Sequence, residues 1–147
     1  DAEFLTARYR LPEPRATLGG ALPGLASAAI DVSDGLLADT GHLARLAGLR
    51  AAIEAAAIPL SAAGKRWIEN QDDRNNAYGR LAAFGDDYEI LFAASPSRRR
   101  AVEMAAKLSK TPVVRIGSFA RGDGVTLIDA TGAEIAVKIG GFDHFAA

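Results

Sequence analysis

Two short stretches of the sequence place carboxylates and a glycine beside an apolar segment. In the first, AAIDVSDGLLAD (28–39), Asp31, Ser33 and Asp34 precede Gly35 where a strand-like run gives way to a helical pattern. Carboxylate oxygens, together with water and phosphate oxygens, are the ligands that Mg²⁺ prefers. Asp31 and Asp34 are therefore candidate metal ligands, and the Ser33 hydroxyl with the helix amides is a candidate phosphate contact. The alternative is that Ser33 or Asp34 only caps the helix while Asp31 forms a turn.

The second stretch is FGDDYEILF (84–92), in which a glycine and two aspartates precede an apolar strand. Glu89 lies one step inside that strand. Burying an unpaired carboxylate is unfavourable by several kcal/mol, so Glu89 must face a partner, water or a ligand. The alternative to a ligand contact is a glutamate at a sheet edge that pairs with an arginine such as Arg115.

A third stretch, GGFDHF (140–145), combines glycines with two aromatic residues near the end of the chain. Phe142 is a candidate to stack on a planar ligand. The alternative is that Phe142 and Phe145 pack in the core and His144 lies on the surface. His42 is the only other histidine, so no Ser–His–Asp site is indicated, and each histidine is expected to be structural or exposed.

Composition excludes several classes of protein. The 147 residues are 49% hydrophobic and 24% charged with a net charge of −1, which is typical of a globular chain and gives no basic face for nucleic acid or an anionic membrane. The absence of cysteine excludes disulfides and thiolate chemistry and fits a cytoplasmic location. Because the chain begins at Asp1 and its only methionine is Met104, we expect a fragment whose upstream portion is missing.

The hydrophobic pattern alternates strands and helices and predicts an α+β fold, a mixed sheet with flanking helices, in one domain over 1–147. Residues 1–24 are expected to be an extended or helical lead-in. The predicted strands are 25–32, 49–60, 87–95, 112–119, 124–130 and 133–139. Helices are predicted after Ser33 up to Gly48, over 61–71, over 77–84 and over 96–109. Gly122–Gly124 and Thr131–Gly132 are predicted hairpin turns.

The order of these stretches, LPEPR, then IDVSDGLLADTGHL, GDDYEILF and GGFDHF, resembles the C-terminal half of the thiamine-monophosphate kinase family. This family belongs to the aminoimidazole-ribonucleotide synthetase superfamily, and the resemblance covers nearly all of the chain. It implies a C-terminal domain of partly ferredoxin-like topology. It also implies a magnesium-dependent homodimer that transfers the γ-phosphoryl group of ATP to thiamine monophosphate.

Residue by residue, the resemblance implies that Asp31 and Asp34 are magnesium ligands and that Ser33 contacts ATP. Glu89 and Phe142 match contacts to thiamine monophosphate. Because the family's N-terminal half holds most nucleotide and metal ligands, we expect the 147-residue chain to fold but to be inactive alone. No general base is assigned, since phosphoryl transfer depends mainly on positioning and charge neutralisation.

Two alternatives remain open from the sequence. The chain could be the corresponding domain of another superfamily enzyme, such as aminoimidazole-ribonucleotide synthetase, selenophosphate synthetase or a hydrogenase-maturation enzyme, all of which use ATP with other acceptors. It could instead be a non-catalytic binding module that keeps the motifs without the activity.

Overall fold

The computed structural model describes residues 1–137. Its five strands are β1 (Ala28–Val32), β2 (Leu49–Glu54), β3 (Glu89–Ala93), β4 (Gly117–Arg121) and β5 (Val125–Ile128). Its α-helices are α1 (Ala2–Arg10), α2 (Ala16–Ala21), α3 (Leu36–Ala47), α4 (Ala62–Glu69), α5 (Arg74–Ala83) and α6 (Arg99–Ser109). Two short 3₁₀ helices, η1 (Ala55–Ala57) and η2 (Pro96–Arg98), complete the described elements.

These strands form two sheets. β1 and β3 make an antiparallel pair in which Asp31 lies opposite Ile90 and Val32 lies opposite Glu89. The other sheet has the order β4-β2-β5, with β2 antiparallel to β4 and parallel to β5. The predicted α+β class with a mixed sheet is thus confirmed, and the two strands that carry the acidic stretches form a separate pair.

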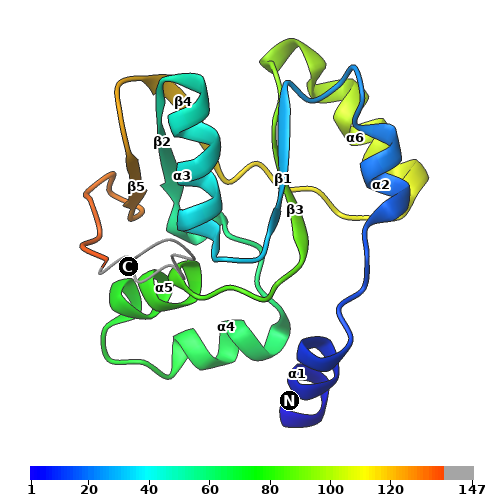
Figure 1. The fold of residues 1–147 in the computed structure, drawn as a ribbon. Helices are drawn as coiled ribbons and strands as arrows, with labels where there is room; N and C mark the ends of the chain where they lie inside the picture. The colour runs from blue at the N-terminus through cyan, green and yellow to red at the C-terminus, as the bar shows by residue number, and fades with distance from the viewer. Residues whose placement is uncertain (138–147) are drawn as a thin grey trace, which may run out of the picture.

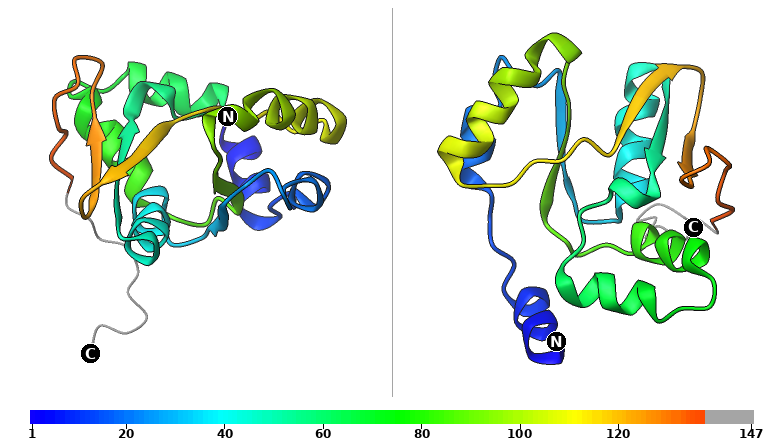
Figure 2. Two further views of the ribbon diagram at one scale, coloured as in Figure 1. Left: turned by 90° about the horizontal axis from the view of Figure 1, so that it is seen from above. Right: turned by 180° about the vertical axis from the view of Figure 1, so that it is seen from behind.

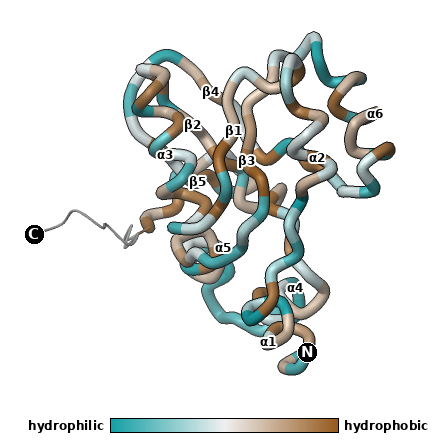
Figure 3. Tube along the Cα trace, turned by 45° about the vertical axis from the view of Figure 1, so that its right-hand side comes forward, coloured by the Kyte–Doolittle hydropathy of each residue, from teal (hydrophilic) through white to brown (hydrophobic). Residues whose placement is uncertain are grey.

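The β1–β3 pair lies at the centre of the molecule (Figure 1). On one side of it, α2 packs against α6; on the other, α3 packs against β1, β2 and β5 (Figures 1 and 2). α4 and α5 pack against each other below the mixed sheet in the view of Figure 1. Apolar segments run through β1 and β3 in the hydropathy colouring (Figure 3).

The main core lies between α3, α5 and the mixed sheet, and its buried members are Leu37, Ile53, Ala55, Ala82, Leu127 and Ile135. Gly48 ends α3 in the left-handed conformation, as predicted. The leucine stripe of α3 is only partly buried, because Leu37 is 3% exposed whereas Leu46 is 85% exposed. The helix therefore contacts the core through one narrow face.

Several predicted details differ from the structure. The prediction of a hairpin at Gly122–Gly124 is wrong, because β4 and β5 pair with opposite edges of β2 and not with each other. The turn at Thr131–Gly132 is present and brings Glu134 back to an antiparallel bridge with Ile128, but no regular strand follows within the described residues. The predicted strand over 49–60 ends at Glu54 and continues as η1.

Among residues 1–137, no helix combines the length and the apolar character needed to cross a membrane.

Candidate functional site

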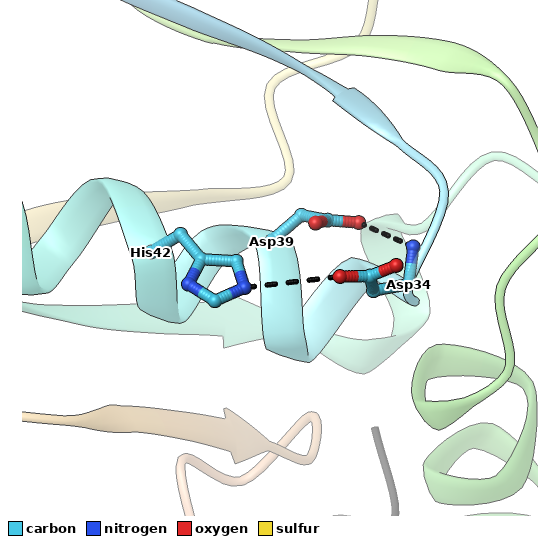
Figure 4. Close-up of side chains that lie close together, drawn as sticks. All are labelled: Asp34, Asp39 and His42. Carbon is cyan, nitrogen blue, oxygen red and sulfur yellow. Dashed lines mark hydrogen bonds and ion pairs between the residues drawn. The ribbon is translucent and has the colours of Figure 1, made fainter. Parts of the chain in front are cut away.

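Asp39 organises the corner between β1 and α3. The Asp39 side chain is 2% exposed, and its Oδ2 accepts N–H bonds from Ser33, Asp34 and Gly35 at 3.0, 3.1 and 3.2 Å. Three consecutive N–H groups that converge on one point form an anion-binding concavity. Here the anion is supplied by the chain itself, from one turn inside the following helix (Figure 4).

This arrangement corrects two expectations. Gly35, with φ of 126°, is the N-terminal boundary residue of α3, and no side chain caps the helix there, so the alternative in which Ser33 or Asp34 caps the helix is wrong. The amides of Ser33, Asp34 and Gly35 donate to Asp39, so the expectation that the amides at this corner hold a phosphate does not apply to these three. Burial raises the pKa of Asp39 above the ordinary aspartate value, and the three N–H donors partly offset that rise.

Asp34 belongs to a cluster with Asp39 and His42. The three side chains each place one ligand-type atom within 4.8 Å of the others, and His42 Nε2 lies 3.9 Å from Asp34 Oδ2 (Figure 4). The other ring nitrogen of His42 is 2.9 Å from an Arg45 guanidinium nitrogen. Sequence reasoning missed Asp39 and His42, although their positions five and eight residues after Asp34 place them on the first turns of the helix.

Asp31 is not a member of this cluster. It is exposed on β1 and lines two adjoining hollows of about 440 and 350 Å³ between the β1–β3 pair and the α2 region. Ile90 lines both hollows, and Tyr88 and Arg15 line the smaller one. Of the two predicted metal ligands, Asp34 is therefore part of the cluster with Asp39 and His42, and Asp31 is not.

The two acidic stretches lie against each other through their glycines. A Cβ atom on Gly85 would lie 2.0 Å from the Ser33 carbonyl oxygen, and one on Gly35 would lie 2.6 Å from the Ala83 carbonyl oxygen. The Asp86 N–H donates to Ser33 O at 2.9 Å, and the loop continues directly into β3. Only glycine permits this backbone approach, so the sequence D-V-S-D-G and the sequence G-D-D-Y-E build one common surface.

The loop that enters β3 contains backbone strain. Asp86 and Tyr88 have φ values of 67° and 51°, a left-handed conformation that is uncommon for residues other than glycine and unfavourable by about 1 kcal/mol or more for each. The Tyr88 N–H donates to Val32 O at 2.8 Å, which holds the loop in place. Such strain persists where surrounding contacts fix the backbone, and it is concentrated at functional sites.

Negative charge accumulates along the same loop. Partial removal from water raises the pKa of the Asp87 carboxyl above the ordinary aspartate value, and the charges of Glu89 and Asp86 add to that rise while Arg8 opposes it. The charge of Asp86 likewise raises the pKa of Tyr88. The loop therefore offers carboxylates that favour a cation or a proton.

Glu89 is paired with two arginines that sequence reasoning did not find. Its Oε1 accepts from Arg8 Nη2 at 2.9 Å and from Arg15 Nη2 at 2.8 Å, and its Oε2 accepts from Arg15 Nε at 2.9 Å. The alternative in which an arginine pairs with Glu89 is therefore present in the structure, with Arg8 and Arg15 as the partners in place of the suggested Arg115. They lie 81 and 74 residues away along the chain, so no local pattern indicates them.

The remaining predicted site residues have simpler outcomes. Ser33 is half-buried at the β1–α3 corner. Asp31, Asp34 and the Ser33 hydroxyl all offer oxygen atoms, which are the hard ligands that suit Mg²⁺. Phe142 and His144 lie outside the described residues.

No family model matches the chain, but comparison with known sequences finds several relatives that share one name. The thiamine-monophosphate kinase of Caulobacter vibrioides is 43% identical over 119 residues, which cover 81% of this chain and 34% of that protein. The thiamine-monophosphate kinases of Haemophilus influenzae and Escherichia coli are 36% and 34% identical and cover 99% of this chain. The chain spans 44% of the length of each of these two relatives.

Solved structures agree with the sequence relatives. The thiamine-monophosphate kinase of Stenotrophomonas maltophilia superposes with a TM-score of 0.75 at 40% identity over 92% of this chain and 41% of that one. The structure of AaThiL complexed with AMPPCP and TMP gives a TM-score of 0.74 at 28% identity over 96% of this chain and 41% of that chain. Escherichia coli HypE, a hydrogenase maturation protein, shares the fold at 20% identity with a TM-score of 0.64, over 92% of this chain and 44% of that one.

The order of motifs, the glycine-packed acidic corners and these relatives agree. The chain matches thiamine-monophosphate kinases over up to 99% of its own length, as a C-terminal fragment of such a protein would, and it spans less than half of their length.

Proposed function

We propose that this chain is the C-terminal part of an ATP-dependent kinase that converts thiamine monophosphate to thiamine diphosphate. The observation that carries the proposal is the contact between the two acidic corners, in which Gly85 packs on Ser33 within a fold shared with AaThiL complexed with AMPPCP and TMP. AMPPCP is a non-transferring analogue of ATP, so that complex pairs a nucleotide with an acceptor of the expected kind.

The proposed roles follow the chemistry of the side chains. Asp31 and Asp34 supply carboxylates for Mg²⁺, and the Ser33 hydroxyl supplies a contact to ATP. Asp39 does not serve as a ligand in this proposal, because one of its oxygens already accepts three N–H bonds; it holds the corner that carries Asp34. When bound, Mg²⁺ would offset the negative charge that develops on the transferred phosphoryl group.

Glu89 and Phe142 are proposed contacts to thiamine monophosphate. In the family resemblance both match substrate-contacting positions, and the charged loop of Asp86 and Asp87 borders the Glu89 end of β3. Homodimeric assembly and a cytoplasmic location are proposed on the same resemblance.

Because the chain spans less than half of its relatives' length, we propose that it provides one wall of the site and is inactive alone. The test measures thiamine diphosphate formation from ATP, Mg²⁺ and thiamine monophosphate by the 147-residue chain and by the full-length protein that contains it. Activity in the full-length protein only is expected. Turnover by the 147-residue chain alone would contradict the shared site.

A substitution in the full-length protein tests the site itself. Asp34→Asn removes one carboxylate charge and is expected to lower kcat/KM on the order of 100-fold or more. Asp123→Asn, at an exposed turn position, is the matched control and should leave activity unchanged. Equal activity of the two variants would exclude Asp34 from the site. Activity with the acceptors of related superfamily enzymes, and none with thiamine monophosphate, would replace the proposed substrate.

A further inference from the structure

The carboxylate of Glu89 is held by two guanidinium groups in a fixed orientation. Arg15 donates from Nε to Oε2 and from Nη2 to Oε1, which is the two-pronged geometry that fits a planar carboxylate. Arg8, near the C-terminal end of α1, donates the third hydrogen bond to this carboxylate, and that bond ends on Oε1. The side chains of Arg8 and Arg15 are partly shielded from solvent, with 31% and 21% of their respective surfaces exposed. The direction of the Glu89 carboxylate is thus set by residues of the N-terminal segment.

The charge of Glu89 is already balanced within this group. Arg15 also contacts Glu13 through Nη1 at 3.0 Å, and Arg8 lies 3.9 Å from the same Glu13 carboxylate oxygen. Two guanidinium groups and two carboxylates therefore neighbour one another, and their formal charges cancel. The hydrogen bond that Arg15 donates to Glu89 is the largest cause of the raised pKa of Arg15, so its guanidinium stays charged over the whole working pH range.

The same contacts limit how many further bonds Glu89 can accept. An ionised carboxylate offers about four acceptor positions, two on each oxygen. Within residues 1–137, both positions on Oε1 are filled by Arg8 and Arg15, and one position on Oε2 is filled by Arg15 Nε. One acceptor position on Oε2 is left. The Glu89 side chain keeps 42% of its surface exposed, so part of this side chain is accessible to a ligand.

These two facts distinguish the two ways in which Glu89 might serve a thiamine substrate. A cationic thiazolium ring beside Glu89 would be a third cation next to the guanidiniums of Arg8 and Arg15, whose charges Glu89 and Glu13 already balance. Attraction for that ring would have to come from the carboxylates of Asp86 and Asp87 in the adjoining loop. A pyrimidine amino group is neutral and needs only one acceptor, which is what Oε2 retains. The geometry therefore favours a directed hydrogen bond over a charge–charge contact.

We propose that Arg8 and Arg15 are positioning residues that hold Glu89 so that its Oε2 accepts one hydrogen bond from the amino group of the substrate pyrimidine. This proposal rests on the proposed function. Its consequence is substrate discrimination, because an analogue with oxygen in place of the amino group brings an acceptor against an acceptor. Since Glu89 is partly exposed, the preference should be about tenfold, as for one net hydrogen bond of about 1.4 kcal/mol.

The experiment uses the full-length protein that contains this chain. Steady-state kinetics are measured with thiamine monophosphate and with the analogue in which a carbonyl oxygen replaces the pyrimidine amino group, and the KM for ATP is measured alongside. The variants are Glu89→Gln, Arg15→Gln, Arg15→Lys and the double variant Glu89→Gln/Arg15→Gln. Arg100→Gln, an exposed arginine on α6, is the matched control. Denaturant unfolding of each variant shows that the comparison is between folded proteins.

The expected result is a preference for the amino substrate of about tenfold in the wild-type protein. Arg15→Gln should lose this preference through a raised KM for thiamine monophosphate, with kcat and the KM for ATP unchanged. The double variant should lose no more than either single variant, since both act through one bond. Arg15→Lys, which keeps the charge but not the fork, should lie between wild type and Arg15→Gln.

Three results would overturn the proposal while leaving the proposed function in place: no preference between the two acceptors in the wild-type protein, additive losses in the double variant, or a preference unchanged by Arg15→Gln. A wild-type protein that phosphorylates neither acceptor overturns the proposed function, and this proposal with it. If Arg15→Gln does not fold, the Arg15→Lys variant decides, because an unchanged preference in that variant contradicts the need for the two-pronged contact.

Discussion

At the scale of single residues, Asp39 determines how the β1–α3 corner responds to pH. Burial raises its pKa, so the folded protein binds a proton on Asp39 more readily than the unfolded chain does. The contribution of Asp39 to stability is therefore greatest below the ordinary aspartate pKa of about 4 and falls as pH rises through the raised value. Asp39→Asn carries no such dependence, because its amide does not titrate.

We expect the stability of the wild-type protein relative to Asp39→Asn to decrease as pH is raised from about 3 to about 7. Urea unfolding of both proteins across this range measures the difference, with Asp123→Asn as the control for removing an exposed charge. A difference that grows in favour of the wild type with rising pH would show that the three N–H donors outweigh burial.

At the scale of elements, the contact between the two glycine corners is the feature most sensitive to substitution. Gly85→Ala would place a methyl group 2.0 Å from the Ser33 carbonyl oxygen, so the start of β3 must move away from β1. We expect a loss of about 2–4 kcal/mol in the free energy of unfolding, because backbone atoms on both sides must shift. Equilibrium unfolding in urea measures it.

Gly20→Ala is the matched control for that change. Gly20 lies in α2 with no atom within 4 Å of its Cβ position, so an alanine there should be neutral or stabilise by up to about 1 kcal/mol. Equal destabilisation by the two substitutions would show that the close approach at Gly85 is relieved by small movements.

Among the elements, the helix ends and turns that depend on glycine follow from the local sequence. Gly48 predicts the end of α3, and Thr131–Gly132 predicts a turn, because both depend on a backbone conformation that glycine alone adopts easily. Gly122–Gly124 gives an equally strong hairpin signal, yet β2 lies between β4 and β5. A local turn signal does not determine which distant strand occupies the place between its two flanking strands.

Site residues divide in the same way. The two acidic corners were recognisable because each pairs a glycine with carboxylates next to an apolar run. The role of Asp39 is also local, because it lies four residues after Gly35. An aspartate in the first turn of a helix, close to the free amides before it, can be recognised in the sequence. Arg8 and Arg15 were not predictable as partners of Glu89, because they reach it from more than 70 residues away.

At the scale of the whole molecule, α1 is the element least integrated with the rest. It has no buried residue, and Phe4, Leu5 and Tyr9 are exposed. Within the described residues it is attached by side-chain bonds, from Arg8 to Glu89 and from Arg66 to Asp1. Ion pairs that solvent reaches, as it reaches both of these in part, contribute about 1 kcal/mol or less each, so α1 should open before the core does.

Hydrogen exchange of the 147-residue chain tests this expectation. Amides of α1 should exchange at least about 100-fold faster than those of α3 and β2, which surround buried core residues. Equal protection of α1 and α3 in the isolated chain would mean that self-association or another contact covers α1, and a dependence of exchange on protein concentration would identify the former.

The internal carboxylate of Asp39 has a consequence for how ligands arrive. Because three consecutive amides are already satisfied by the chain, the corner attains its shape during folding and does not wait for a phosphate to organise it. Little conformational entropy then remains to be lost at this corner on binding. The surface that carries Asp34 should accordingly be superimposable in the empty and occupied protein, with adaptation on binding confined to other segments.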